Sequence, residues 1–211
     1  MSLEYHKINS IFKRDPSGKT ILWGEYAQPE FAYLADNQWV FTEKVDGTNI
    51  RVMWDGEHIT FGGKTDNAQL PAPLFQRLHS MFSPIDMATT FDGPACLYGE
   101  GYGAGIQKGG KYSPTPEFVL FDVQVGEWWL LREQVEAVAL SLGCKVVPIV
   151  GYGTLGDMIR KCESAYASAW GDFPAEGIVA RPGVELRDRA GRRVITKFKL
   201  RDFDAAGKER T

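Results

Sequence analysis

Three β-prone segments follow one another closely in the first third of the chain. The first, residues 39–42, runs into a loop from Glu43 to Asn49. In the second, residues 50–54, large apolar side chains occupy every other position, which is typical of a half-buried strand. Asp55-Gly56 is a hairpin turn signal, and residues 58–61 return. The stretch therefore predicts a β-hairpin that is preceded by a loop containing a lysine.

Lys44 lies where the first of these strands ends. A lysine amine becomes nucleophilic when neighbouring cations or desolvation lower its pKa. Asp46 and Asn49 place a carboxylate and an amide in the same loop, and Gly47 lets backbone approach a ligand closely. Taken alone, the loop is better explained as a hairpin connection with solvated charges.

The remaining pattern predicts hairpins with inserted helices. Helical spacing of apolar residues begins at Pro73, a second helix begins near Arg132, and Thr154 can cap a third. The expected strands cover residues 5–12, 95–98, 117–125, 144–150, 176–181 and 193–200. We therefore expect an α+β fold of antiparallel sheets, in one domain over residues 1–211 without a C-terminal accessory domain.

The charge pattern limits how the chain could bind nucleic acid. The 211 residues carry a net charge of −3, so no global basic field is present. Residues 181–201 hold eight Lys or Arg against two acids and form a local basic patch. Strand alternation puts Lys197 and Lys199 on one face, where an anion between them would relieve their repulsion. A half-exposed edge strand explains them as well.

The cysteines and the apolar runs exclude other classes. The three cysteines are far apart and have no zinc-ligand spacing. We expect a reduced, cytoplasmic setting. No run approaches the ~20 apolar residues that a membrane helix needs, so we expect no membrane contact.

A glycine-rich segment follows the strand at residues 95–98. It includes Glu100 and extends from Gly99 to Lys111. Its spacing is not that of a dinucleotide-binding turn, because no helix pattern follows it. Either a polar ligand or a mobile surface loop would explain this composition.

Several of these features stand in a fixed order along the chain: Lys44 with Asp46 and Gly47, Glu100 in Leu-Tyr-Gly-Glu-Gly, Phe121 in Phe-Val-Leu-Phe-Asp, Glu176 in Glu-Gly-Ile-Val-Ala, and Lys197-Phe-Lys199. This set resembles the lysine-dependent nucleotidyltransferases, which are the polynucleotide ligases and mRNA capping enzymes. The run Gly-Ile-Gln-Lys-Gly is most similar to the RNA ligase 2-like branch of ATP-dependent RNA ligases. The resemblance covers about residues 39–201 and implies their ATP-grasp-like catalytic fold.

The resemblance implies a role for each matching residue. Lys44 would form a lysyl-AMP, and Asp46 and Glu176 would hold hydrated Mg²⁺, or Mn²⁺, through water. Lys64 replaces the usual arginine, and Asp46 replaces the histidine of RNA ligase 2-like members. Nucleotide-binding roles would fall to Glu43, Asn49, Lys64, Glu100, which would hold the ribose, Phe121 and Val179, which would contact the adenine, and Lys197 and Lys199, which would grip the α-phosphate.

The implied activity is ATP-dependent sealing of RNA 5′-phosphate and 3′-hydroxyl ends, through a lysyl-AMP and an RNA-adenylate. A nicked duplex is the expected substrate, with a protein partner supplying extra nucleic-acid binding. Three alternatives stay open: a minimal ATP-dependent DNA ligase, a capping guanylyltransferase, and an adenylate- or RNA-binding module without turnover.

Overall fold

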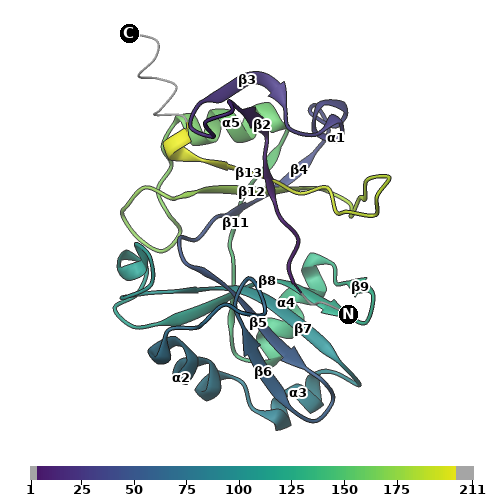
Figure 1. Cartoon of the computed structure of the whole chain (residues 1–211), viewed down its shortest axis with the longest axis vertical. Coiled ribbons are helices and arrows are strands. Elements are labelled where there is room, and N and C mark those ends of the chain that lie inside the picture. The colour runs from purple at the N-terminus through teal and green to yellow at the C-terminus, as the bar shows by residue number, and fades with distance from the viewer. Residues whose placement is uncertain (1–3, 203–211) are drawn as a thin grey trace. The chain divides into compact units, whose positions relative to one another are not determined.

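The computed structural model describes residues 4–202, and the chain divides into two compact units (Figure 1). Unit 1 contains residues 45–147 together with the N-terminal residues up to Tyr5. Unit 2 contains residues 6–44 and the chain from Pro148 onward. The chain passes between the units directly after Lys44, so the predicted nucleophile is the last residue of a unit 2 segment. A single catalytic domain over residues 1–211 stays a prediction.

Unit 1 is built on a six-stranded sheet. Its order is β10-β8-β7-β5-β6, with β9 paired to β8. All pairs are antiparallel except β10 with β8, which is parallel. The strands are β5 (Thr48–Trp54), β6 (Ile59–Gly62), β7 (Ala95–Tyr102), β8 (Glu117–Val125), β9 (Trp128–Trp129) and β10 (Lys145–Val146).

One face of this sheet forms the core of unit 1. Ile50, Val52 and Trp54 of β5 are buried in it, which confirms the predicted alternation. The helices contribute their apolar stripes to the same cluster, because only one stripe of a surface helix needs cover. These helices are α2 (Ala72–Met81), α3 (Pro84–Thr90) and α4 (Arg132–Ser141), and a 3₁₀ turn η1 covers Gly109–Lys111.

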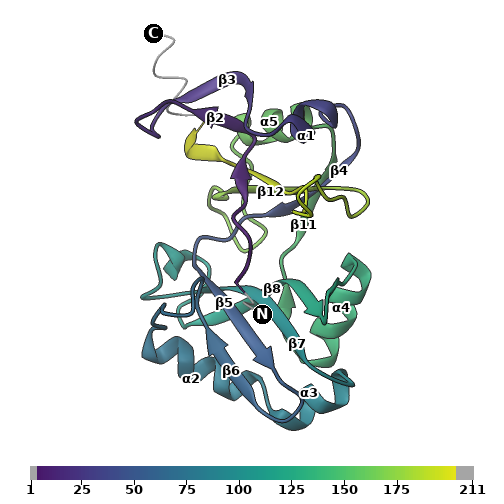
Figure 2. The same cartoon turned by 45° about the vertical axis from the view of Figure 1, so that its right-hand side comes forward.

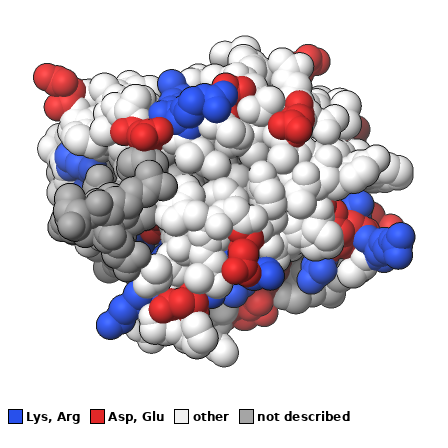
Figure 3. Space-filling model, turned by 90° about the horizontal axis from the view of Figure 1, so that it is seen from above, with Lys and Arg blue, Asp and Glu red and all other residues white. Residues whose placement is uncertain are grey.

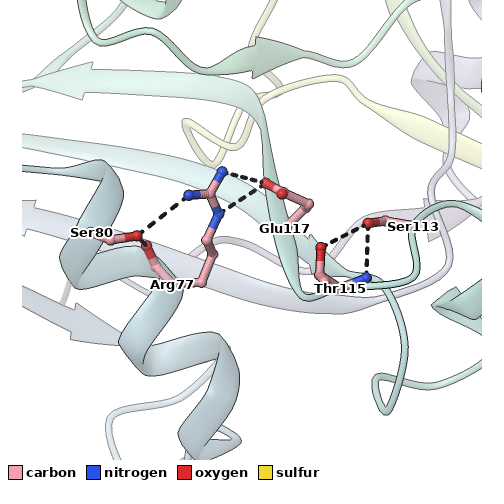
Figure 4. A network of polar contacts seen from close by, with 5 residues as sticks. All are labelled: Arg77, Ser80, Ser113, Thr115 and Glu117. Carbon is pink, nitrogen blue, oxygen red and sulfur yellow. Dashed lines mark hydrogen bonds and ion pairs between the residues drawn. The ribbon is translucent and has the colours of Figure 1, made fainter.

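A polar network joins α2 to the start of β8 (Figure 4). Arg77 donates to the Glu117 carboxylate through Nε at 3.2 Å and Nη2 at 3.0 Å, and to Ser80 Oγ at 3.4 Å. Beside it, the Thr115 N–H donates to Ser113 Oγ at 3.2 Å. The residues that connect the glycine-rich segment to β8 are therefore held in place by hydrogen bonds.

Unit 2 has a five-stranded sheet in the order β1-β13-β12-β4-β11, and β2 and β3 pair separately. The edge pair of β1 with β13 is parallel, and the other pairs are antiparallel. The strands are β1 (Asn9–Ser10), β2 (Phe12–Arg14), β3 (Ile21–Tyr26), β4 (Trp39–Glu43), β11 (Ile149–Gly153), β12 (Gly177–Pro182) and β13 (Thr196–Lys199).

Two helices, α1 (Pro29–Tyr33) and α5 (Leu155–Glu163), complete unit 2. The core gathers Trp39 and Phe41 of β4 with Leu155 and Met158 of α5. Thr154 caps α5 as predicted: its Oγ1 accepts from Asp157 N at 3.1 Å, and the Asp157 carboxylate accepts the Thr154 N–H at 2.8 Å. These backbone and side-chain bonds from Thr154 lower the pKa of Asp157 to about 2.

The observed architecture confirms the predicted mixture of antiparallel sheets and inserted helices, with two parallel edge pairs added. Of the expected strand at residues 5–12, only Asn9–Ser10 (β1) and Phe12, the first residue of β2, lie in strands. The expected strand at residues 144–150 is divided at Pro148 between β10 and β11. Proline cannot donate a ladder hydrogen bond, which explains the division. Among residues 4–202, no helix is both long and apolar enough to cross a membrane.

Candidate active site

A cluster of two cations and one anion lies at the end of β4 in unit 2. Lys44 Nζ donates to Glu176 Oε2 at 2.6 Å, and Lys199 Nζ lies 2.7 Å from Glu176 Oε1. The three side chains are between 13% and 20% exposed, so they are shielded but reachable from solvent. The structure thus brings together three of the predicted site residues that are more than 20 positions apart in sequence.

Charge explains why this carboxylate stays ionised. Burial alone would raise the pKa of Glu176, but the ammonium groups of Lys44 and Lys199 outweigh burial and lower the pKa. β12 begins at Gly177, so Glu176 precedes the strand, as it must if Glu176 and Val179 are to reach one ligand. The main chain is fixed here too, because Lys44 N donates to Gly177 O at 2.9 Å.

Glu43 precedes the nucleophile candidate and is only 1% exposed. Its carboxylate accepts from Ser168 Oγ at 2.6 Å and from Ala169 N at 2.8 Å. These donors belong to the segment between α5 and β12, which ends at Glu176. The carboxylate of Glu43 therefore binds protein donors, whereas a nucleotide-binding role for Glu43 stays a prediction.

The half-buried face of β12 and β13 carries the other predicted residues of unit 2. Lys197 and Lys199 are half-buried and alternate along β13 with the buried Thr196 and Phe198, which confirms that the two lysines share a face. Val179 pairs with Lys197 in the register and is also half-buried. An anion lying on this face would meet the two lysines in succession.

In unit 1, Asn49 and Glu100 are direct partners across β5 and β7. Cross-strand neighbours have Cβ atoms about 4.5–5.5 Å apart, so both side chains lie on the same face. The Asn49 Oδ1 atom is buried and has no hydrogen-bond partner among the described residues. An unmatched buried acceptor is costly, which makes Asn49 a candidate for binding a donor from a ligand.

Asp46 lies in the turn that leads into β5. It is half-exposed, and no hydrogen bond or ion pair joins its carboxylate to a described residue. Gly47 follows it, and a Cβ at this position would lie 2.2 Å from the Gly101 carbonyl oxygen. The protein's own backbone therefore explains why this turn needs a glycine.

Phe121 occupies a β-bulge. In the pairing of β7 with β8, Tyr98 is opposite Asp122 and Gly99 is opposite Leu120, so Phe121 is the extra residue. Its ring packs on the edge of Tyr5, with ring centroids 5.2 Å apart. A bulge re-aims a side chain, and here the aromatic ring of Phe121 is half-exposed.

Lys64 is exposed in the turn after β6, and a buried arginine supports that turn. Arg51 is 1% exposed. It donates through Nε to Gly63 O at 2.7 Å and through Nη1 to Asp66 at 2.8 Å. Arg51 lies two positions after Asn49 in β5. The alternation of side chains along a strand could therefore have indicated from the sequence that Arg51 shares a face with Asn49. The partners of Glu43 carried no sequence signal.

No group of three or more His, Cys, Asp or Glu side chains that could hold a metal ion occurs among residues 4–202. The two carboxylates predicted to bind metal through water, Asp46 and Glu176, belong to different units. Their predicted role therefore stays a prediction.

Comparisons with known proteins give a consistent family. The model of the family described as RNA ligase matches residues 37–199. No curated protein matches the chain. The similar solved structures described next are only 17–18% identical to this chain, so their likeness shows the fold alone.

Three of the similar structures are forms of a Naegleria gruberi RNA ligase. A mutant with ATP and Mn aligns over 86% of this chain and 54% of its own, at TM-score 0.64 and 18% identity. A mutant with AMP and Mn aligns over 86% and 55%, at TM-score 0.65 and 18% identity. The form with PPi aligns over 97% and 64%, at TM-score 0.64 and 17% identity. The chain thus spans little more than half the length of the first of these proteins.

Proposed function

This chain belongs to the RNA ligase family, and we propose that it is an ATP-dependent RNA ligase that joins 5′-phosphate to 3′-hydroxyl ends. One observation carries the proposal: the Lys44 amine and the Lys199 ammonium group share the Glu176 carboxylate at the end of β4. The structures of relatives with ATP and Mn, and with AMP and Mn, support ATP and a divalent metal as its cofactors.

In the first step, Lys44 Nζ attacks the α-phosphorus of ATP. A P–N bond forms, the bond from the α-phosphorus to the bridging oxygen breaks, and pyrophosphate leaves. Because Lys44 donates to Glu176, the amine must exchange this partner and lose a proton before its lone pair can attack. Lys199 would meanwhile supply a fixed positive charge, which is the kind of help that phosphoryl transfer needs.

In the second step, a 5′-phosphate oxygen of the RNA attacks the same phosphorus, and the P–N bond breaks. This gives an RNA-adenylate and frees Lys44. In the third step, the 3′-hydroxyl attacks the 5′-phosphate, a phosphodiester forms, and AMP leaves. The roles of Glu43, Asn49, Lys64, Glu100, Phe121, Val179 and Lys197 in holding the nucleotide remain as the resemblance implies them.

Hydrated Mg²⁺ or Mn²⁺ would neutralise phosphate charge during these steps. Hard cations take carboxylate oxygens, and Mg²⁺ keeps most of its waters, which fits binding by Asp46 and Glu176 through water. The Asp46 carboxylate has no hydrogen bond or ion pair with a described residue, so it has no competing partner to lose.

The test is covalent labelling. The protein is incubated with ATP labelled at the α-phosphate and with Mg²⁺, then denatured. We expect label on wild type, none on Lys44→Ala, and full label on Lys13→Ala, which removes an exposed lysine from unit 2. Equal labelling of Lys44→Ala, or labelling from GTP alone, would contradict the proposal.

We also propose that a nicked duplex is sealed better than two free single strands, with a protein partner adding affinity for nucleic acid. A pair of nicks that differ only in a 2′-hydroxyl at the 3′-hydroxyl terminus separates an RNA ligase from a DNA ligase. Faster sealing of the all-DNA nick would identify a DNA ligase.

A further inference from the structure

The segment that joins β12 to β13, residues 183–195, extends past the ends of both strands (Figure 1, Figure 2). We refer to it as the arginine hairpin. Its two sides are linked by a bridge between Arg187 and Arg193. The hairpin contains four arginines and two acids, and it belongs entirely to unit 2.

Both acids of the arginine hairpin are occupied internally. The Arg193 guanidinium is buried and binds Glu185, with Nη2 2.9 Å from Oε2. Arg192 donates to Asp188 at 2.7 Å, and the Asp188 carboxylate also accepts the backbone N–H groups of Ala190 and Arg192 at 2.9 and 2.8 Å. The bond from the Arg192 backbone N–H holds the pKa of Asp188 below its usual range. These pairs fix the turn and leave neither acid available for the other arginines.

Arg187 and Arg189 are the arginines that remain. Both are exposed, and neither makes a hydrogen bond or ion pair through its side chain with any residue between 4 and 202. Since the hairpin is held by the other pairs, these two side chains are not needed for its shape. Arg187 and Arg189 therefore present two exposed guanidinium groups from a hairpin whose turn is held by other hydrogen bonds.

The face of the sheet beside the hairpin is also cationic. Along β12, Val179 and Arg181 are half-buried and alternate with buried neighbours, so they share the face of Lys197 and Lys199. At about 3.3 Å per residue, the five steps from Gly177 to Pro182 span roughly 17 Å.

On the face of the molecule in Figure 3, acidic and basic side chains are intermixed, and no broad field of one sign is visible. The net charge of −3 likewise gives the chain no general attraction for polyanions. A polyanion must therefore be bound by a local arrangement, and the arginine hairpin provides one. The planar fork of arginine also matches phosphate oxygens better than a lysine does.

We propose that Arg187 and Arg189 bind phosphates of the RNA backbone, so that the arginine hairpin forms a sequence-independent RNA-binding surface. The proposal rests on the proposed function, and it adds where the RNA is held. Each of the two side chains neutralises one phosphate.

The test compares wild type with the double variant Arg187→Gln, Arg189→Gln. RNA binding is measured by filter retention of a labelled nicked RNA duplex between 50 and 200 mM salt. Each phosphate contact contributes about 0.7–0.9 to the slope of log affinity against log salt. Losing two contacts should reduce that slope by about 1.4–1.8, so wild type should lose about tenfold more affinity than the variant over this range.

Two controls accompany this measurement. Lys7→Gln, Lys19→Gln removes two exposed lysines from unit 2 whose side chains make no ion pair with residues 4–202, and it should leave the slope unchanged. The charge-retaining Arg187→Lys, Arg189→Lys should keep the slope of wild type. An unchanged slope in the glutamine variant, or an equal loss in the lysine control, would overturn the proposal.

Lysyl-AMP formation without RNA separates this proposal from the proposed function. The glutamine variant should be labelled by ATP at the rate of wild type, and a loss of labelling would mean that the hairpin acts on the nucleotide and not on RNA. If wild type itself is not labelled, the proposed ligase activity fails. In that case, the salt dependence of RNA binding still tests whether the arginine hairpin binds RNA.

Discussion

Glu43→Ala should lower both stability and the labelling rate, because the carboxylate of Glu43 holds two protein donors in place. The buried carboxylate joins the end of β4 to Ser168 and Ala169, and the chain continues from there to Glu176. Its loss would free the segment that brings Glu176 to Lys44. We therefore expect the 2.6 Å contact between these two side chains to loosen.

The magnitude follows from the bonds that are lost. Removing a partner from a buried donor costs about 1–3 kcal/mol, and two donors are affected here. The Ala169 N–H has a fixed direction, but the Ser168 hydroxyl can rotate toward another acceptor while its oxygen still accepts from Trp170 N. We therefore expect about 2–4 kcal/mol in total for Glu43→Ala. Glu43→Gln retains the shape and can accept from Ala169 N while donating to Ser168 Oγ. It should therefore cost only about 1 kcal/mol.

The assay is thermal unfolding together with the labelling rate at saturating ATP. For a chain of this size, 1 kcal/mol shifts Tm by about 2–4 °C. Glu43→Ala should lower Tm by about 5–15 °C and slow labelling at least tenfold, whereas Glu43→Gln should lower Tm by about 2–4 °C. Glu163→Ala, an exposed glutamate in the same unit, is the matched control. If Glu43→Ala has the same Tm as this control, or if Glu43→Gln lowers Tm and labelling as much as Glu43→Ala, then Glu43 does not position Glu176 beside Lys44.

Three further variants test single features of the structure. A lowered pKa means that Glu176 stabilises the fold above about pH 4.3 and loses this effect as pH falls through its folded pKa. The Tm gap between wild type and Glu176→Gln should therefore stay constant from pH 7 down to about pH 5 and close only as pH falls below about 4.3. Thr154→Ala removes the α5 cap and should cost about 1 kcal/mol, and an NMR titration should show the pKa of Asp157 rising from about 2 toward its ordinary value. Gly177→Ala should reduce both Tm and labelling, because its Cβ would lie 2.2 Å from a neighbouring carbonyl oxygen, whereas Gly183→Ala, with 3.6 Å to its nearest atom, should melt like wild type.

Local patterns in the sequence predicted the parts of the fold that depend on neighbours in the chain. The alternation in β5, the shared face of Lys197 and Lys199, and the cap at Thr154 are all confirmed. Each rests on a period of two or on a contact three residues away, which a sequence displays directly.

The features that sequence did not predict depend on distant pairs. Glu43 and Ser168 are 125 residues apart, and no spacing rule relates them. Unit 2 is itself assembled from two separated stretches of chain, and its edge strand β1 pairs in parallel with β13. Such pairings close long loops, and the local hydrophobic pattern contains no record of which strands will meet.

The two carboxylates predicted to bind metal share one structural device. Asp46 is followed by Gly47 and Glu176 by Gly177, and at each glycine a Cβ would lie 2.2 Å from the carbonyl oxygen of an adjacent strand, that of Gly101 or of Phe198. Any side chain there would push the strands apart. In each unit, the absence of a side chain at the glycine thus lets a neighbouring strand pack closely against the backbone directly after the carboxylate-bearing residue. The glycines of these motifs are therefore explained by the packing of the protein backbone, before any ligand is considered.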